Sequence, residues 1–325
     1  MITRIEKNTI KKGNVLYTGI FSPASSGTKQ QISDVVLDDG YLKTSINDSS
    51  NFNDVKVKNS DFAGNVSNPN LLINGDFRVN QRGGSTYTQL GYTVDRWRID
   101  GGTPVVVTPN TDGGIRINNT SSSNLYFIQY IENYNMLAGK IVSYSVKVNG
   151  TVYSNTFTMP SPFVANTGYG NIFTPFGVIY FYYYSDGKLG FTVQVNAGQN
   201  IYIDYAKLEI GSAATQFSPR PYAEELVMCQ RYYNSVFVNG CSQIYQGSIY
   251  FTKDLPTTMR VSPSLTMIDE CYTYTYDGNY IGVGTVTINS MRGSSISLKV
   301  TNSAFTNNVV ISTGIFSIKL DAEIY

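Results

Sequence analysis

The chain has 325 residues, of which 14% are charged, and it carries a formal net charge of +1 with no histidine. Its length exceeds that of a usual single domain, so we expect more than one hydrophobic core. Positive and negative residues are interleaved, which leaves no basic stripe for a phosphate backbone and makes nucleic acid a poor candidate partner. The lack of histidine excludes serine–histidine and cysteine–histidine nucleophile pairs and histidine metal sites.

The composition favours an all-β fold, because 26 Tyr, 16 Phe and 29 Gly suit short strands joined by tight turns. The longest continuously apolar run, residues 179–184, is far shorter than the ~20 residues that cross a bilayer as a helix, so we expect no membrane insertion. Residues 1–14 lack the apolar stretch of a secretory signal. Cys229, Cys241 and Cys271 show no C-x-x-C spacing, which argues against a metal knuckle or a redox pair.

The first segment, residues 1–68, is polar and poor in aromatic residues. Alternating apolar residues occur over 34–42 and 55–58, between clusters of Gly, Ser and Asn. Too few apolar side chains fall on one face to offset the entropy of ordering the chain, so we expect this segment to order against other chains. A flexible tail with no docking role is the alternative.

Residues 69–221 have a dense β pattern, with turn dipeptides at Asn149-Gly150, Asp186-Gly187 and Ala197-Gly198. Many short strands without helical periodicity predict two antiparallel sheets packed face to face, for which a jelly roll is the simplest arrangement. The strand candidates are 71–73, 97–100, 105–108, 114–118, 125–131, 140–149, 151–159, 178–184, 188–195 and 201–210. The single tryptophan, Trp97, shares a strand with Ile99, and we expect it in the core.

A connecting helix is predicted over 222–238, directly after two prolines that end the preceding strand. Glu224 and Glu225 fall in its first turn, where the helix dipole favours negative charge. The apolar residues that recur at helical spacing are Tyr222, Leu226, Cys229, Tyr233 and Phe237. Residues 239–325 return to a β pattern and predict a second, smaller β-sandwich, with strands at 248–252, 264–267, 271–276, 281–288, 295–301 and 314–322.

Two sequence stretches separated by about 120 residues resemble those of a known protein family. The sequences NLLINGDFRVNQRG and YTVDRW lie within 70–97, and QFSPRPYAEELVMCQRYY occupies 216–233. Both closely resemble the ends of a jelly-roll domain of bacteriophage tail-fibre and receptor-binding proteins, where it is similar to a carbohydrate-binding module. DLPTTMRVSP at 254–263 and LDAEI at 320–324 resemble the terminal lobe of such fibres.

The resemblance implies a homotrimeric virion fibre, on the tail or the capsid, that is made in the host cytoplasm. In this interpretation residues 1–68 attach to other virion proteins and assist oligomerisation. Residues 69–221 form the carbohydrate-binding-module-like jelly roll, 222–238 form the connecting helix and 239–325 form the tip. The expected function is non-enzymatic adhesion to a bacterial surface glycan.

Candidate carbohydrate-binding residues lie in the run 179–184. Alternation along a strand sends Ile179, Phe181 and Tyr183 to one face and three tyrosines to the other. A row of phenols suits stacking against a saccharide or contact with a neighbouring subunit, and two tyrosines of another strand would extend it. Ordinary cross-strand pairing that stabilises the sheet is the alternative. The candidates are Tyr180, Tyr182, Tyr184, Tyr126 and Tyr130.

The resemblance also implies a structural calcium ion. In that fold the segment that begins NGDF at 74–77 lies beside the segment at 201–209, and a calcium ion is often held there. Asp76 and Asp204 are the candidate ligands, because calcium prefers hard oxygen donors. The alternative is that Asp76 caps a turn while Asp204 accepts hydrogen bonds from a loop.

Two other functions remain open at this point. A purely structural virion protein of the capsid fibre, collar or baseplate would place the tyrosines at subunit interfaces. A polysaccharide depolymerase would need two facing carboxylates, and the candidate pairs are Asp269 with Glu270 and Asp321 with Glu323. The chain shows no parallel β-helix repeat typical of phage tailspike enzymes, which disfavours the depolymerase.

Overall fold

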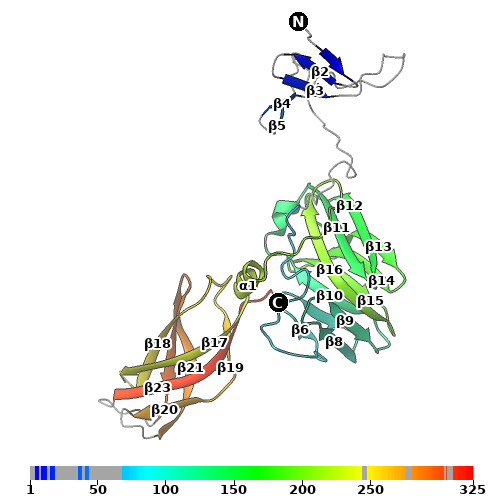
Figure 1. The fold of residues 1–325 in the computed structure, drawn as a ribbon. Coiled ribbons are helices and arrows are strands. Elements are labelled where there is room, and N and C mark those ends of the chain that lie inside the picture. Colours follow the sequence, from blue (N-terminus) through cyan, green and yellow to red (C-terminus); the bar gives the residue numbers. More distant parts are fainter. Residues whose placement is uncertain are drawn as a thin grey trace. The chain divides into compact units, whose positions relative to one another are not determined.

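A computed structural model describes residues 68–325 except 244–246, 276–279, 304, 306–309 and 325. It also describes the backbone of five short strands near the start of the chain, and the backbone alone of 240–243, 275, 283 and 310–315. The chain divides into two compact units, residues 1–64 and 65–325. Figure 1 shows the strands of both units.

The first unit contains one five-stranded antiparallel sheet whose strands follow chain order. The last two strands coincide with the alternating pattern expected over 34–42. The pattern expected at 55–58 lies outside the described residues. The strands are β1 (Arg4–Glu6), β2 (Thr9–Lys12), β3 (Val15–Thr18), β4 (Val36–Asp38) and β5 (Tyr41–Lys43).

The second unit begins with a β-sandwich, named here the central sandwich. Its six-stranded sheet has the order β13 (Thr167–Thr174), β14 (Gly177–Tyr183), β15 (Leu189–Val195), β10 (Leu125–Tyr130), β7 (Arg98–Gly101) and β6 (Gly91–Tyr92). Its five-stranded sheet has the order β12 (Thr151–Thr158), β11 (Ile141–Val148), β16 (Asn200–Ile210), β9 (Ile115–Asn119) and β8 (Val105–Pro109). All neighbours are antiparallel, which confirms the predicted all-β architecture.

One apolar core fills the space between these two sheets. Trp97 is fully buried in it, as predicted, and its ring stacks on Phe127 with centroids 4.8 Å apart and planes 16° apart. The indole N–H donates to the carbonyl oxygen of Asn74 at 2.9 Å, so the polar atom of the tryptophan is satisfied inside the core. The predicted turn Asn149-Gly150 joins β11 and β12, and both residues have positive φ, 49° and 81°.

The predicted connecting helix is shorter than expected. Helix α1 covers Tyr222–Gln230, and strand β17 (Tyr233–Gln243) follows almost at once, so the prediction is wrong beyond residue 230. Val236 and Val238 are 7% and 3% exposed whereas Phe237 is 56% exposed, which is the two-residue period of a strand. The tertiary pairing of β17 with β23 (Val310–Asp321) overrides the helical spacing of Tyr233 and Phe237.

The C-terminal lobe, defined here as residues 233–324, has a core of its own. Seven antiparallel strands, linked in one continuous sheet, surround this core, so the β character predicted for this part of the chain is confirmed. The long strand β21 (Tyr280–Arg292) pairs with β20 along its first part and with β22 along its second part, so it joins the two halves of the sheet. The remaining strands are β18 (Ser248–Asp254), β19 (Ser264–Met267), β20 (Cys271–Thr275) and β22 (Ser295–Thr301).

Buried ion pairs connect the central sandwich to the end of β23. The Arg96 guanidinium is 1% exposed and pairs with Glu323, whose side chain is fully buried. Arg96 also lies over the Tyr232 ring, 3.6 Å from its centroid. Arg82 pairs with Asp321 at 3.3 Å and with Glu323 at 3.4 Å. No helix in the described residues is long and apolar enough to cross a membrane.

Candidate functional site

Five tyrosines gather on the face of the six-stranded sheet that points away from the core. They come from β14, the turn after it and β10, and we call them the tyrosine surface: Tyr126, Tyr130, Tyr180, Tyr182 and Tyr184. Ile179 and Phe181 are fully buried in the core, as the alternation predicted, and Tyr183 packs against that core. All five predicted candidates therefore share one face, although β15 separates β14 from β10.

The rings of the tyrosine surface contact one another edge to face. The centroids of Tyr180 and Tyr182 are 6.3 Å apart with planes 86° apart. Tyr184 lies 4.7 Å from Tyr182 and 5.6 Å from Tyr130, again at steep angles of 67° and 76°. Tyr126 lies on the same face, because it pairs with Gln194 of β15 two residues along from Thr192, the partner of Tyr180. Edge-to-face contact is a favoured geometry for aromatic pairs, so the rings hold one another in place.

Strand β15 provides the floor between the tyrosines. Gly190 lies opposite both Tyr182 of β14 and Tyr130 of β10. A Cβ atom at Gly190 would lie 2.9 Å from Cγ2 of Ile128 and 3.3 Å from Cε2 of Tyr184. Glycine at this position therefore lets the rings of the two strands close over the sheet. Sequence reasoning missed this residue, because the neighbours of β15 are set by the sheet topology.

Burial raises the pKa of three phenols of the tyrosine surface, those of Tyr130, Tyr180 and Tyr184, which keeps them neutral. Burial raises the pKa of Tyr180 to about 12, with further contributions from the charges of Tyr126 and Tyr182. Burial also raises the pKa of Tyr184, which is hydrogen-bonded to Tyr130. Neutral phenols act both as donors and as acceptors of hydrogen bonds. The surface therefore offers apolar ring area together with uncharged hydroxyl groups.

Charged side chains at the margin of the tyrosine surface neutralise one another. Arg98 and Asp100 form an ion pair at 2.6 Å, and Lys188 and Asp186 form another at 2.7 Å. The cationic groups of Arg98 and Lys188 lie 5.7 Å and 5.6 Å from the centroid of the Tyr130 ring. Thr192 of β15 is fully buried on the same face, and its hydroxyl has no hydrogen-bond partner among the described residues.

The two candidate calcium ligands have separate basic partners. Asp76 pairs with Arg78 through one oxygen, and its other oxygen is buried with no partner in the described part of the chain. Asp204 lies 3.5 Å from the Lys147 ammonium. No group of three or more acidic, cysteine or histidine side chains in the described residues is placed to hold a metal ion. Two carboxylates that are each paired with a cation fit a calcium site poorly, and calcium stays a prediction.

The candidate acid pair Asp321 and Glu323 belongs to the junction between the central sandwich and the C-terminal lobe. Glu323 is 3% exposed and is engaged by Arg96 and Arg82, while Asp321 also pairs with Arg82. A carboxylate enclosed in this way has no access to a substrate. The geometry gives these two groups a structural role.

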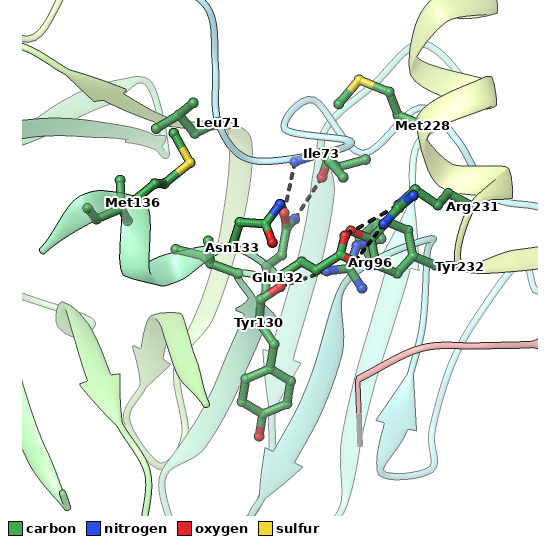
Figure 2. A pocket seen from close by; sticks show the side chains of 13 residues that line it. Leu71, Ile73, Arg96, Tyr130, Glu132, Asn133, Met136, Met228, Arg231 and Tyr232 are labelled. Carbon is green, nitrogen blue, oxygen red and sulfur yellow. Dashed lines mark hydrogen bonds and ion pairs between the residues drawn. The ribbon is translucent and has the colours of Figure 1, made fainter. Parts of the chain in front are cut away.

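A pocket of about 240 Å³ lies between α1 and the central sandwich, as Figure 2 shows. Several of its polar groups bond one another. Glu132 accepts hydrogen bonds from Arg231 at 2.7 Å and from the Tyr232 hydroxyl at 2.6 Å, and Gln129 bonds both backbone groups of Ile73. Burial would raise the pKa of Glu132, but the bonds from Arg231 and Tyr232 outweigh it and lower this pKa.

The rest of this pocket is apolar, with Leu71 and Met136 on one side and Met228 on the other (Figure 2). The ring of Tyr130 points away from the pocket, in keeping with its place on the tyrosine surface. The pocket therefore suits a small apolar group better than a polyhydroxylated one. The sequence did not indicate it, because its walls come from segments far apart in the chain.

A second hollow lies at the end of β7 and β10, next to the tyrosine surface. It is open, polar and free of charged residues. We call it the loop hollow, and it is lined by Gly101, Gly102, Thr103, Ser122, Ser123, Asn124 and Tyr126.

Comparison with known proteins does not assign this chain to a protein family. No protein-family model matches the sequence, and no curated protein matches it.

Proposed function

We propose that this chain is a bacteriophage fibre protein that adheres to glycans on the bacterial surface without cleaving them. Residues 69–221 would be a jelly roll similar to a carbohydrate-binding module, with the tyrosine surface as its binding face. The observation that supports this most is the gathering of five tyrosines on one face of one sheet, beside side chains whose charges cancel.

The chemistry of the tyrosine surface matches that of a sugar. The C–H groups of a pyranose ring pack on aromatic rings, and each such contact contributes on the order of 1 kcal/mol. Sugar hydroxyls need donors and acceptors, which the neutral phenols and the Arg98–Asp100 pair supply. These contacts need no chemical step.

Adhesion by such a surface would depend on many copies. A single shallow site of this kind binds with a dissociation constant on the order of mM. In a homotrimer, three sites on each fibre, and several fibres on each particle, would raise the overall affinity without any new contact. We propose a homotrimer on this ground and on the resemblance to phage fibres. Residues 1–68 would attach it to other virion proteins.

The decisive test is glycan-array binding by the full-length protein and by the variant Tyr182→Ala. Tyr182 contacts both Tyr180 and Tyr184, so its removal opens the row at the centre. We expect the affinity for any bound glycan to fall about fivefold, from the loss of roughly 1 kcal/mol of stacking. The control is Tyr250→Ala, which removes a half-buried tyrosine from β18 of the C-terminal lobe.

Two outcomes would contradict the proposal. Equal glycan affinity of Tyr182→Ala and the native protein would show that the tyrosine surface does not bind the glycan. Release of new reducing ends from a bound polysaccharide would indicate an enzyme. A third result, no binding to any glycan together with tyrosines protected from chemical labelling in the assembled fibre, would favour the purely structural virion protein.

A further inference from the structure

The loop hollow and the tyrosine surface share one residue. Tyr126 lines the hollow. Tyr126 pairs with Gln194 of β15, two residues along from Thr192, which pairs with Tyr180, so Tyr126 and Tyr180 share one face of the sheet. In the sheet, Tyr126 pairs with Asp100 of β7, so the Arg98–Asp100 ion pair lies next to Tyr126 on the same face. The hollow is thus continuous with the tyrosine surface.

The loop at 120–124 is held in one conformation by a buried asparagine. Asn119 is fully buried, and its amide nitrogen donates to the carbonyl oxygens of Ser123 at 2.9 Å, Val195 at 3.0 Å and Asn196 at 3.1 Å. Its amide oxygen accepts from the backbone N–H and the hydroxyl of Ser121 at 3.2 Å and 2.7 Å. A loop fixed in this way loses little entropy when it binds a ligand.

Two glycines bring the facing loop close to this one. Gly101 has φ +101°, and a Cβ atom there would lie 2.5 Å from the Asn124 carbonyl oxygen and 2.9 Å from Cδ2 of Tyr126. The N–H of Gly102 donates to the same carbonyl oxygen at 2.9 Å. The chain can therefore pass directly beside the Tyr126 ring, which leaves the ring as one wall of a preformed hollow.

The exposed groups of the hollow are hydroxyls and an amide. Thr103, Ser122, Ser123 and Asn124 are exposed, and none of the lining residues is charged. Such groups recognise the hydroxyls of an uncharged sugar, with Tyr126 available for stacking.

We propose that the loop hollow is a subsite for an uncharged sugar residue, joined through Tyr126 to the tyrosine surface. The ligand would then be an internal stretch of an uncharged oligosaccharide or polysaccharide and not a single terminal sugar. Tyr130 is only 6% exposed, whereas Tyr180, Tyr182 and Tyr184 are partly exposed. From Tyr180 to Tyr184 the surface extends about 13 Å along β14 and the turn after it, which is longer than one pyranose ring. This inference rests on the proposed function and adds the charge and the length of the ligand.

The test measures affinity against chain length for the full-length protein. The probes are maltose-, cellobiose- and chitobiose-type ladders from monosaccharide to hexasaccharide, with oligogalacturonides as the charged ladder. We expect at least one uncharged ladder to bind, with an affinity that rises with length. In Asn124→Ala the ratio of the hexasaccharide affinity to the monosaccharide affinity should fall about fivefold, because one hydrogen bond is lost.

Asn239→Ala, which changes an exposed asparagine of β17, is the matched control and should leave the length dependence unchanged. Thermal unfolding checks that Asn124→Ala is folded, as expected for an exposed side chain. Three results would overturn the subsite but not the proposed adhesion. They are an affinity that does not depend on ligand length, an unchanged length dependence in Asn124→Ala, and a preference for the charged ladder. Absence of binding to every ladder and to the glycan array would overturn the proposed function itself.

Discussion

At the scale of the residue, Gly190 shows how one missing side chain shapes the tyrosine surface. Its neighbours across the sheet are Tyr182 and Tyr130, and the ring of Tyr184 lies over it. A methyl group at this position would meet Ile128 at 2.9 Å, closer than real Cβ contacts come. The position of the rings thus depends on a residue that has no side chain.

We expect Gly190→Ala to lower the free energy of unfolding by about 1–3 kcal/mol, because the added methyl overpacks the face. Displacement of Tyr130 and Tyr184 should also weaken glycan binding. Gly168→Ala is the matched control, since the nearest atom to its new Cβ would be at 3.6 Å, an ordinary contact. That change should be neutral or stabilising. Denaturant titration measures the free energy of unfolding of both variants. An equal loss of stability in Gly190→Ala and Gly168→Ala would show that overpacking at Gly190 is not the cause.

At the scale of the element, the segment after α1 shows that local spacing and tertiary pairing can disagree. Tyr222, Leu226, Cys229, Tyr233 and Phe237 have helical spacing, yet the helix ends at Gln230. The N–H of Tyr232 bonds the carbonyl oxygen of Cys229, and the chain then extends into β17. Pairing along most of β23 supplies more burial to this segment than a longer helix would, so the strand forms.

The strand assignment makes a prediction opposite to that of the helical pattern. Phe237→Ala should change the free energy of unfolding by well under about 1 kcal/mol, because the ring is 56% exposed. Val238→Ala removes less volume, but from a side chain that is 3% exposed, and should cost about 2 kcal/mol. Thermal or denaturant unfolding compares the two. A larger loss for Phe237→Ala would instead support the helix.

At the scale of the whole molecule, the end of β23 connects the C-terminal lobe to the central sandwich. Glu323 accepts from Arg96, and Arg260 donates to the carbonyl oxygens of Ala322 and Glu323 at 2.9 Å and 3.0 Å. The Tyr92 hydroxyl donates to the Ile324 carbonyl oxygen at 2.5 Å. The bonds from Arg96 and Tyr92 join residues more than two hundred positions apart, so the two lobes of this unit are expected to unfold together.

We expect Glu323→Ala to destabilise the protein by about 3–5 kcal/mol, because it leaves the buried Arg96 charge without its partner. Calorimetry should show a lower melting temperature and a loss of cooperativity between the lobes. Glu270→Ala, which removes an exposed carboxylate of the C-terminal lobe, provides the comparison and should have little effect. Unchanged melting of Glu323→Ala would show that the ion pair does not hold the lobes together.

The sequence by itself determined those features that depend on local periodicity. Alternation placed Tyr180 and Tyr182 opposite the buried Ile179 and Phe181, and turn chemistry placed the bend at Asn149-Gly150. These follow from the two-residue repeat of a strand and from the backbone preferences of Asn and Gly, which are properties of neighbouring residues.

Only the tertiary structure decided which strands became neighbours and what they enclosed. It inserted β15 between β14 and β10, brought Glu323 to Arg96 and ended α1 at Gln230. The loop hollow, with walls from 101–103 and 122–126, arises in the same way. Long-range pairing depends on the burial available across the whole fold, and a sequence pattern read a few residues at a time does not contain that quantity.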